Sequence, residues 1–247
     1  MPIIMYHQVK TFNAGKDVIL PWEFENDLKY LSENNYITIT MSDLIDYVYN
    51  GKSLPEKPVI LTFDDGYLNN YVYVYPLLKE YNMKIVFSII GKNIDDFTNI
   101  PDDNIDYSHV TWDQLCEMLD SGCVEVQNHT YNLHNYSKYT VGCAQKYGET
   151  FMEYEMRLNE DIGRLQEEII EMTGRTPNTF AYPFGKYCDE MDEILKKLGF
   201  KASLTCDYGV NVINMDDPDS LFSLKRICRS HGQGIEKLIK EGLKTVR

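Results

Sequence analysis

The sequence predicts an α/β protein built around a parallel sheet, either doubly wound or closed as a barrel. Three observations indicate this class. Short β-rich runs alternate with longer segments of helical periodicity along the 247 residues. The run VILTF at 59–63 has the pattern of a strand buried on both faces. No internal repeat and no linker rich in Pro, Gly or Ser interrupts the chain, so we expect a single domain over residues 1–247.

About seven strands are expected, because β-branched and aromatic residues cluster in short runs. In chain order the runs are Ile3–Tyr6, Pro58–Phe63, Lys84–Ile90, Val124–Gln127, Thr179–Tyr182, Lys201–Thr205 and Ser223–Cys228. The stretches 95–107 and 136–149 are the least regular, and we expect them to be surface loops.

Helical periodicity and capping signals place the helices between these strands. They are expected at Phe24–Ser32, Ser42–Tyr49, Thr111–Gly122, Phe151–Met172, Glu190–Leu198 and Ile235–Leu243. Thr111 and Gln114 have the spacing of a capping box, and Gly122 is a stop signal. In the helix from Phe151, an apolar stripe runs from Ile162 to Met172, and Gly174 follows as its stop.

Composition excludes some classes of protein. With 24 Lys+Arg against 38 Asp+Glu, the formal charge is −14, which argues against an electrostatic nucleic-acid binder. No apolar run approaches the roughly 18 residues that span a bilayer, so we expect no membrane span. The six cysteines form no CxxC pair, and a domain of this size does not need disulfides, so free thiols are favoured.

The first residues, MPIIMYHQV, show neither a basic segment nor a long apolar segment of an export signal. We therefore expect a cytoplasmic location for the chain as written. A location in the cell envelope or outside the cell is the alternative, if an upstream segment has been removed.

Titratable side chains follow three of the expected strands at the point where each strand ends. His7 follows the first strand, Asp64 and Asp65 follow the second, and His129 and His134 follow the strand at 124–127. Ligands and catalysis gather at the carboxyl ends of parallel strands, so these side chains are expected to point at one place. Adjacent aspartates also occur in ordinary turns, but here they come directly after a buried strand.

Two histidines and one carboxylate indicate a catalytic metal site. His129 and His134 would diverge by roughly 140° on a helix, but in a loop they can converge on one ion. Such a set leaves positions open for water and substrate. We interpret His109 and His231 as structural or surface residues. The segment Phe180–Gly185 is either a turn that closes a strand or an apolar wall whose backbone N–H groups face the site.

Three motifs together resemble those of the polysaccharide deacetylases, the NodB-homology group of carbohydrate esterase family 4. They are Thr62–Gly66 (TFDDG), His129–His134 (HTYNLH) and Tyr182–Gly185 (YPFG). The resemblance extends from Ile3 to about Arg226. It implies an irregular (β/α), TIM-like barrel and a divalent metal. It also implies an enzyme that removes acetyl groups from N-acetylated sugars, with an oligo- or polysaccharide as substrate.

The sequence departs from the usual pattern of that family in two places. The usual Leu-x-His motif near the C-terminus is absent, and Pro2–His7 (PIIMYH) opens the chain instead. This arrangement is similar to the circularly permuted subgroup of poly-β-1,6-N-acetylglucosamine deacetylases, in which the N-terminal strand supplies that histidine. Ala181 stands where the family often has an Arg that orients the catalytic carboxylate, and Arg226 is a candidate substitute.

The resemblance implies a role for each residue. Asp65, His129 and His134 would hold the metal, with zinc first and cobalt, nickel or iron as alternatives. Asp64 would be the general base and His7 the general acid. The oxyanion and the substrate would be bound by a further group, which comprises the backbone N–H of Phe184 and the side chains of Tyr182, Tyr131 and Arg226.

Three other interpretations remain open. An enzyme of the same family that cleaves acetyl esters, for instance on xylan, would share every catalytic residue. A non-haem iron oxygenase also uses two His and one carboxylate, but it would leave Asp64 without a role. A carbohydrate-binding protein that has lost catalysis is the third, and the Ala181 departure keeps it in consideration.

Overall fold

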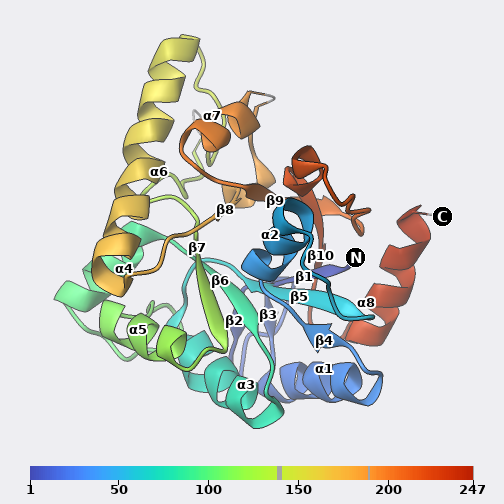
Figure 1. The fold of residues 1–247 in the computed structure, drawn as a ribbon. Helices are drawn as coiled ribbons and strands as arrows, with labels where there is room; N and C mark the ends of the chain where they lie inside the picture. The colour runs from blue at the N-terminus through green and yellow to red at the C-terminus, as the bar shows by residue number, and fades with distance from the viewer. Residues whose placement is uncertain (138–140, 189, 247) are drawn as a thin grey trace.

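Seven parallel strands close a barrel at the centre of the molecule (Figure 1), which confirms the predicted class. The computed structural model describes residues 1–137, 141–188 and 190–246. Around the barrel the order is β1 (Ile3–Tyr6), β10 (Leu224–Cys228), β9 (Ala202–Tyr208), β8 (Thr179–Ala181), β7 (Val124–Asn128), β6 (Ile85–Ile89) and β5 (Pro58–Phe63). Each of the seven lies within two or three residues of its expected range.

The first strand closes the barrel, because β1 pairs with β10 on one side and with β5 on the other. Its register on β5 runs from Ile3 opposite Ile60 to Tyr6 opposite Phe63. The rings of Tyr6 and Phe63 stack at 4.8 Å between centroids. The two strands therefore end level with each other, and the residues that follow them emerge side by side.

Short strands lie beside the barrel. Among the described residues they are β2 (Gln8–Val9), β3 (Val18–Ile19) and β4 (Ile37–Thr38). The first two pair with each other, and β4 adds to the amino-terminal end of β5. The sequence analysis did not find these strands, since two residues carry no detectable period.

Eight α-helices surround the barrel in the part of the chain that the structure describes. They are α1 (Pro21–Glu33), α2 (Met41–Asn50), α3 (Tyr75–Tyr81), α4 (Gly91–Asn99), α5 (Trp112–Asp120), α6 (Phe151–Thr173), α7 (Met191–Lys197) and α8 (Ile235–Gly242). The Thr111–Gln114 capping box is confirmed, and Gly174 ends α6 in the left-handed conformation. None of the described helices combines the length and hydropathy needed to cross a membrane.

Helices α3 and α4 were not expected from the sequence. The segment that leads into α3, Asn70–Val74, is a π-helical turn of aromatic and β-branched residues, a composition that favours strands. Helix α4 begins without a side-chain cap, and its second half occupies 95–99, where we expected a loop. That part of the loop expectation is wrong. Of the other expected loop, residues 138–140 lie outside the described residues. The described part contains turns, irregular chain and an isolated antiparallel β-bridge between Tyr136 and Val141.

Helix α2 covers one end of the barrel, where it packs against the apolar side chains of Ile3, Ile60, Val86 and Leu204. The carboxylate of Glu125, near the start of β7, accepts hydrogen bonds from the backbone N–H groups of the first turn of α2. This places α2 at the amino-terminal ends of the strands. The opposite end of the barrel is thus the one available for a site.

Candidate active site

A cavity of about 570 Å³ opens at the carboxyl ends of the barrel strands. It is lined by residues on or after β1, β5, β7, β8, β9 and β10. All five titratable residues singled out in the sequence line it, namely His7, Asp64, Asp65, His129 and His134. The structure therefore brings together side chains that are far apart along the chain.

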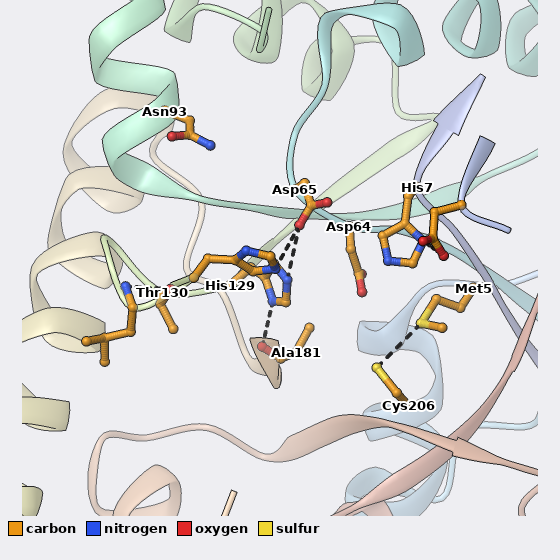
Figure 2. Close-up of polar contacts among 12 residues, drawn as sticks. Met5, His7, Asp64, Asp65, Asn93, His129, Thr130, Ala181 and Cys206 are labelled. Carbon is orange, nitrogen blue, oxygen red and sulfur yellow. Dashed lines mark hydrogen bonds and ion pairs between the residues drawn. The ribbon is translucent and has the colours of Figure 1, made fainter. Parts of the chain in front are cut away.

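One group in the cavity has the geometry of a metal site. The Nε2 atoms of His129 and His134 lie 3.4 and 3.3 Å from Oδ1 of Asp65 (Figure 2). The three ligand atoms lie within 4.8 Å of one another. Oδ1 of Asp65 is buried and has no hydrogen-bond partner among the described residues, an arrangement that costs free energy unless another positive group satisfies it. The donor set therefore fits a divalent cation.

A hydrogen bond to the backbone fixes the orientation of the His129 ring. Its Nδ1–H donates a 2.7 Å hydrogen bond to the backbone carbonyl of Ala181, so the Nε2 lone pair faces the cavity. The ring of His134 packs against the ring of Phe184, with 4.2 Å between centroids. Position 181 thus contributes through its backbone, which any residue type would supply.

The protonation states of Asp65 and His134 favour metal binding, whereas the facing carboxylates of Asp65 and Asp64 outweigh burial and raise the pKa of His129. Burial opposes the charge on Asp65, but the facing imidazoles outweigh it and hold the pKa of Asp65 well below its usual range. Burial and the neighbouring His129 lower the pKa of His134 to about 4. A carboxylate and a neutral imidazole are the forms that ligate a cation at neutral pH.

Asp64 is held apart from this group by a buried ion pair with Arg226. Two N–H groups of the guanidinium bind the two carboxylate oxygens at 2.9 and 2.8 Å. The same guanidinium donates to the carbonyl of Thr205 and the hydroxyl of Thr62, at 2.7 and 3.2 Å. Burial would raise the pKa of Asp64, but Arg226 outweighs it and lowers the pKa. Asp64 is therefore a fixed anion at the floor of the cavity.

Three non-glycine residues around the cavity adopt left-handed backbone conformations. The φ angles are 75° at Asp65, 74° at Thr130 and 57° at Phe184. Neighbouring side chains of a strand point to opposite faces, so the turn at Asp65 is what lets both aspartates reach one cavity. Strained residues of this kind gather at functional sites.

His7 lies on the side of the cavity next to Asp64 (Figure 2). Its backbone carbonyl accepts a 2.9 Å hydrogen bond from the side chain of Asn70. Nδ1 lies 4.0 Å from Oδ1 of Asp17, which also lines the cavity. The sequence analysis missed Asp17, because an acidic residue in a polar loop gives no signal until the fold brings it to a histidine.

Three side chains expected to contact substrate make contacts within the protein. Tyr182 lines the cavity, but its side chain is fully buried, stacks on Tyr187 and hydrogen-bonds to Asp192. Tyr131 is buried too, and its hydroxyl joins Asp95 of α4 to Arg164 of α6. Arg226 is buried, and its guanidinium is engaged in the ion pair with Asp64, so it has no exposed surface for substrate. It stands instead where the alternative expectation placed it, as a substitute for the Arg missing at 181.

Phe184, the fourth residue expected to bind the oxyanion or the substrate, lines the cavity and has 39% of its surface exposed. The two histidines interpreted as structural lie elsewhere. His109 is buried under the ring of Tyr67, at 4.7 Å between centroids. Nδ1 of His231 lies 2.7 Å from Glu23, beside α1.

Comparison with known proteins identifies the class. The sequence model of the polysaccharide deacetylase family matches residues 51–203, and the chain belongs to that family. This confirms the resemblance inferred from the motifs.

Particular relatives narrow the group. The chain is 30% identical over 202 residues to the poly-β-1,6-N-acetyl-D-glucosamine N-deacetylase of Escherichia coli K12, covering 73% of this chain and 30% of that protein. It is 29% identical over 209 residues to YxkH of Bacillus subtilis, covering 85% of this chain and 65% of that protein. The chain thus spans from about a third to two thirds of the length of these relatives.

Solved structures share the whole fold. A de-N-acetylase from Aggregatibacter actinomycetemcomitans superposes with a TM-score of 0.83 and 29% identity, over 97% of this chain and 98% of that chain. IcaB from Ammonifex degensii superposes with a TM-score of 0.75 and 25% identity, over 98% and 96% of the two chains. The barrel with β1 as its closing strand is therefore similar to these proteins from end to end.

Proposed function

We propose that this protein is a metal-dependent hydrolase that removes N-acetyl groups from an N-acetylglucosamine-containing glycan and releases acetate. The observation that carries the proposal is the Asp65–His129–His134 group beside the buried Asp64–Arg226 pair, in one cavity. The name of the relative from Escherichia coli supports a β-1,6-linked polymer as the substrate.

Asp65, His129 and His134 would hold the metal, with zinc as the first choice and cobalt, nickel or iron as alternatives. The bound ion would polarise the acetyl carbonyl and lower the pKa of a water molecule. The buried carboxylate of Asp65 and the fixed Nε2 of His129 keep two of the ligands aimed before the ion arrives.

Asp64 would take the proton from the attacking water. Both of its oxygens are held by Arg226, which fixes the carboxylate in place and keeps it ionised. The water oxygen then forms the new bond to the acetyl carbon. The backbone N–H of Phe184, presented by its left-handed turn, would stabilise the negative charge that develops on the carbonyl oxygen.

His7 would donate a proton to the sugar nitrogen as the C–N bond breaks, so that the products are acetate and a free amine. It lies beside Asp64 in the cavity (Figure 2), where a leaving group can reach it. Asp17, whose Oδ1 lies 4.0 Å from Nδ1 of His7, would orient the imidazole. Asp17 is thus a positioning residue in this proposal.

The test is acetate release from β-1,4- and β-1,6-linked N-acetylglucosamine oligomers by metal-stripped protein, with zinc or cobalt added back. We expect release that depends on the added metal, is lost in Asp64→Asn, and is greater with the β-1,6 oligomers. Acetylated xylan serves as the comparison substrate. Release from xylan alone would replace the proposal with an acetyl esterase. Stoichiometric metal binding without release from any substrate would leave a binding protein.

A further inference from the structure

The backbone around His7 is held by the segment that follows β5. The N–H of Asp64 donates a 3.1 Å hydrogen bond to the carbonyl of Tyr6, the last residue of β1. The side-chain amide of Asn70 donates a 2.9 Å hydrogen bond to the carbonyl of the next residue, His7. Two successive carbonyls are thus fixed by residues 64–70, the segment that also supplies both aspartates to the cavity.

Asn69 fixes the two residues that come after His7. Its side-chain oxygen accepts a 3.0 Å hydrogen bond from the N–H of Val9. Its side-chain N–H groups donate to the carbonyl of Ile105 and to the side-chain oxygen of Gln8, at 3.2 and 3.3 Å. The chain therefore cannot shift at His7 without breaking hydrogen bonds on both sides of it.

Asn70 is a costly residue for a purely structural position. Its side chain is fully buried, and its Oδ1 has no hydrogen-bond partner among the described residues. A buried polar atom without a partner lowers stability by an amount comparable to the gain from one hydrogen bond. Asn70 also begins the π-helical turn at Asn70–Val74, a rare conformation that is frequent at functional sites. These features indicate that the contact with His7, rather than stability, accounts for this residue.

The position of the His7 ring depends on its backbone. No hydrogen bond to the imidazole is found among the described residues, and Oδ1 of Asp17 lies 4.0 Å from Nδ1, beyond hydrogen-bond distance. Because Nδ1 is buried, Nε2 is the ring nitrogen that can serve a leaving group in the cavity. Proton transfer needs donor and acceptor about 2.6–3.2 Å apart, so a shift of about 1 Å in the backbone would take Nε2 out of reach.

We propose that Asn70 is a positioning residue for His7, which it holds by the carbonyl so that Nε2 lies where the sugar nitrogen leaves. The inference rests on the proposed deacetylase function, in which His7 supplies the proton. As the C–N bond breaks, its electron pair stays on the nitrogen, and the proton passes to that nitrogen from Nε2. Asn70 does not line the cavity, so it acts on the reaction through His7.

The nature of the leaving group separates this role from a merely structural one. An amine leaves only with a proton, whereas the phenolate of para-nitrophenyl acetate leaves without one. In zinc-loaded Asn70→Ala, we expect kcat for acetate release from N-acetylglucosamine oligomers to fall by about 10- to 100-fold, with KM within about 2-fold. Zinc-dependent cleavage of para-nitrophenyl acetate should stay within about 2-fold. Equal losses on both substrates would overturn the proposal, since they would mean that Asn70 only supports the fold.

A double variant tests the same point without the ester. His7→Ala/Asn70→Ala should release acetate at the rate of His7→Ala, because Asn70 then has nothing to position. Additive losses would overturn the proposal. If Asn70→Ala lacks the zinc-induced rise in Tm of the folded protein, Asn70→Ser, whose side chain is too short to reach the His7 carbonyl, takes its place. Asn34→Ala is the matched control, because it removes a 2.8 Å bond from a side-chain amide to the Tyr30 carbonyl, and it should leave both rates unchanged.

The single variant His7→Ala distinguishes failure of this inference from failure of the proposed function. Undiminished acetate release by His7→Ala, or no release by the unmodified protein, would contradict the proposed mechanism itself. A loss in His7→Ala without a loss in Asn70→Ala would overturn the positioning role alone.

Discussion

Asp64 and Asp65 are neighbours in the chain, yet their surroundings give them different chemistry. Both carboxylate oxygens of Asp64 accept from N–H groups of the Arg226 guanidinium. Oδ1 of Asp65, in contrast, faces two imidazoles and has no hydrogen-bond partner among the described residues. One carboxylate is therefore held as a fixed anion, and the other is left open toward a cation. The left-handed turn at Asp65 makes this division possible, because it directs both side chains to one cavity.

The first prediction separates these two roles. Asp64→Asn should leave zinc affinity within a few-fold of the original, because the amide is not among the ligands. Acetate release should fall by about 10³-fold, the size typical of a lost general base. Metal content by elemental analysis and initial rates of release provide the two measurements. Loss of zinc in this variant would show that Asp64 is itself a ligand.

The second prediction concerns the pair that holds Asp64. Arg226→Met leaves a buried carboxylate without its partner, and we expect a loss of about 3–5 kcal/mol in the free energy of unfolding. The double variant Asp64→Asn/Arg226→Met removes both charges and should recover a large part of that loss. Urea unfolding measures both. Equal destabilisation of the single and the double variant would mean that Arg226 acts through packing alone.

At the scale of elements, buried polar contacts away from the cavity join the helices to one another and to the barrel. The hydroxyl of Tyr131 joins α4 to α6, and Glu125 of β7 fixes the start of α2 at the far end of the barrel. Neither residue touches the cavity. Neither contact was predicted from motifs, since a buried polar contact between distant elements has no local sequence pattern.

The third prediction tests the contact of α2. The Glu125 carboxylate accepts from the backbone N–H groups of Met41 and Ser42 at 2.9 and 3.0 Å. Glu125→Ala leaves both donors without that acceptor, so we expect the free energy of unfolding to fall by about 2 kcal/mol. Glu167→Ala, which removes an exposed carboxylate from α6, is the control and should change it by less than about 0.5 kcal/mol. A similar effect of both variants would argue against the contact.

The fourth prediction is a pH dependence of stability that arises at His109. Burial lowers the pKa of His109 to about 4, and the amide of Asn93 lies 3.0 Å from its Nε2. The unfolded chain takes up a proton near pH 6.5, before the folded chain does, so acid favours unfolding. Stability should therefore be full above about pH 6.5 and fall toward pH 4, by about 3 kcal/mol from this residue.

His109→Gln, which keeps an acceptor for Asn93 but does not titrate, should remove that part of the slope. Unfolding of both proteins between pH 4 and pH 7, with zinc present, measures the difference. Parallel curves would exclude His109 as the source.

At the scale of the whole molecule, the positions of the strands and of the site residues that follow them could be predicted from the sequence. Which strands pair with each other could not. Apolar runs such as that before Asp64 mark buried strands, and residues after strand ends mark a site. Closure by β1 could not be derived from periodicity, because pairing partners far apart leave no local trace. For the same reason Asp17 was missed, and the contacts of the Tyr131 and Tyr182 hydroxyls with Asp95 and Asp192 were not predicted.

The fifth prediction concerns the metal and the stability of the fold. An ion that binds only the folded chain stabilises it by about 2.7 kcal/mol at a concentration 100 times its dissociation constant. Zinc should therefore raise the Tm of metal-stripped protein by roughly 5 °C or more. Asp65→Asn should abolish the rise, whereas His231→Gln, which changes a histidine away from the cavity, should keep it. A rise that persists in Asp65→Asn would place the zinc elsewhere.

Closure of the barrel by β1 means that the site is assembled from both the middle and the two ends of the chain. The three residues that would hold the metal come from segments after β5 and β7, in the middle of the chain, whereas His7 and Arg226 come from near its two ends. A partly folded chain can thus gather the ion before the seam between β1 and β10 has formed. The proposed mechanism uses both His7 and Arg226, so we expect turnover to require that seam, and the onset of activity during refolding should report on the meeting of the chain ends. Metal binding alone would therefore not show that the two ends of the chain have come together.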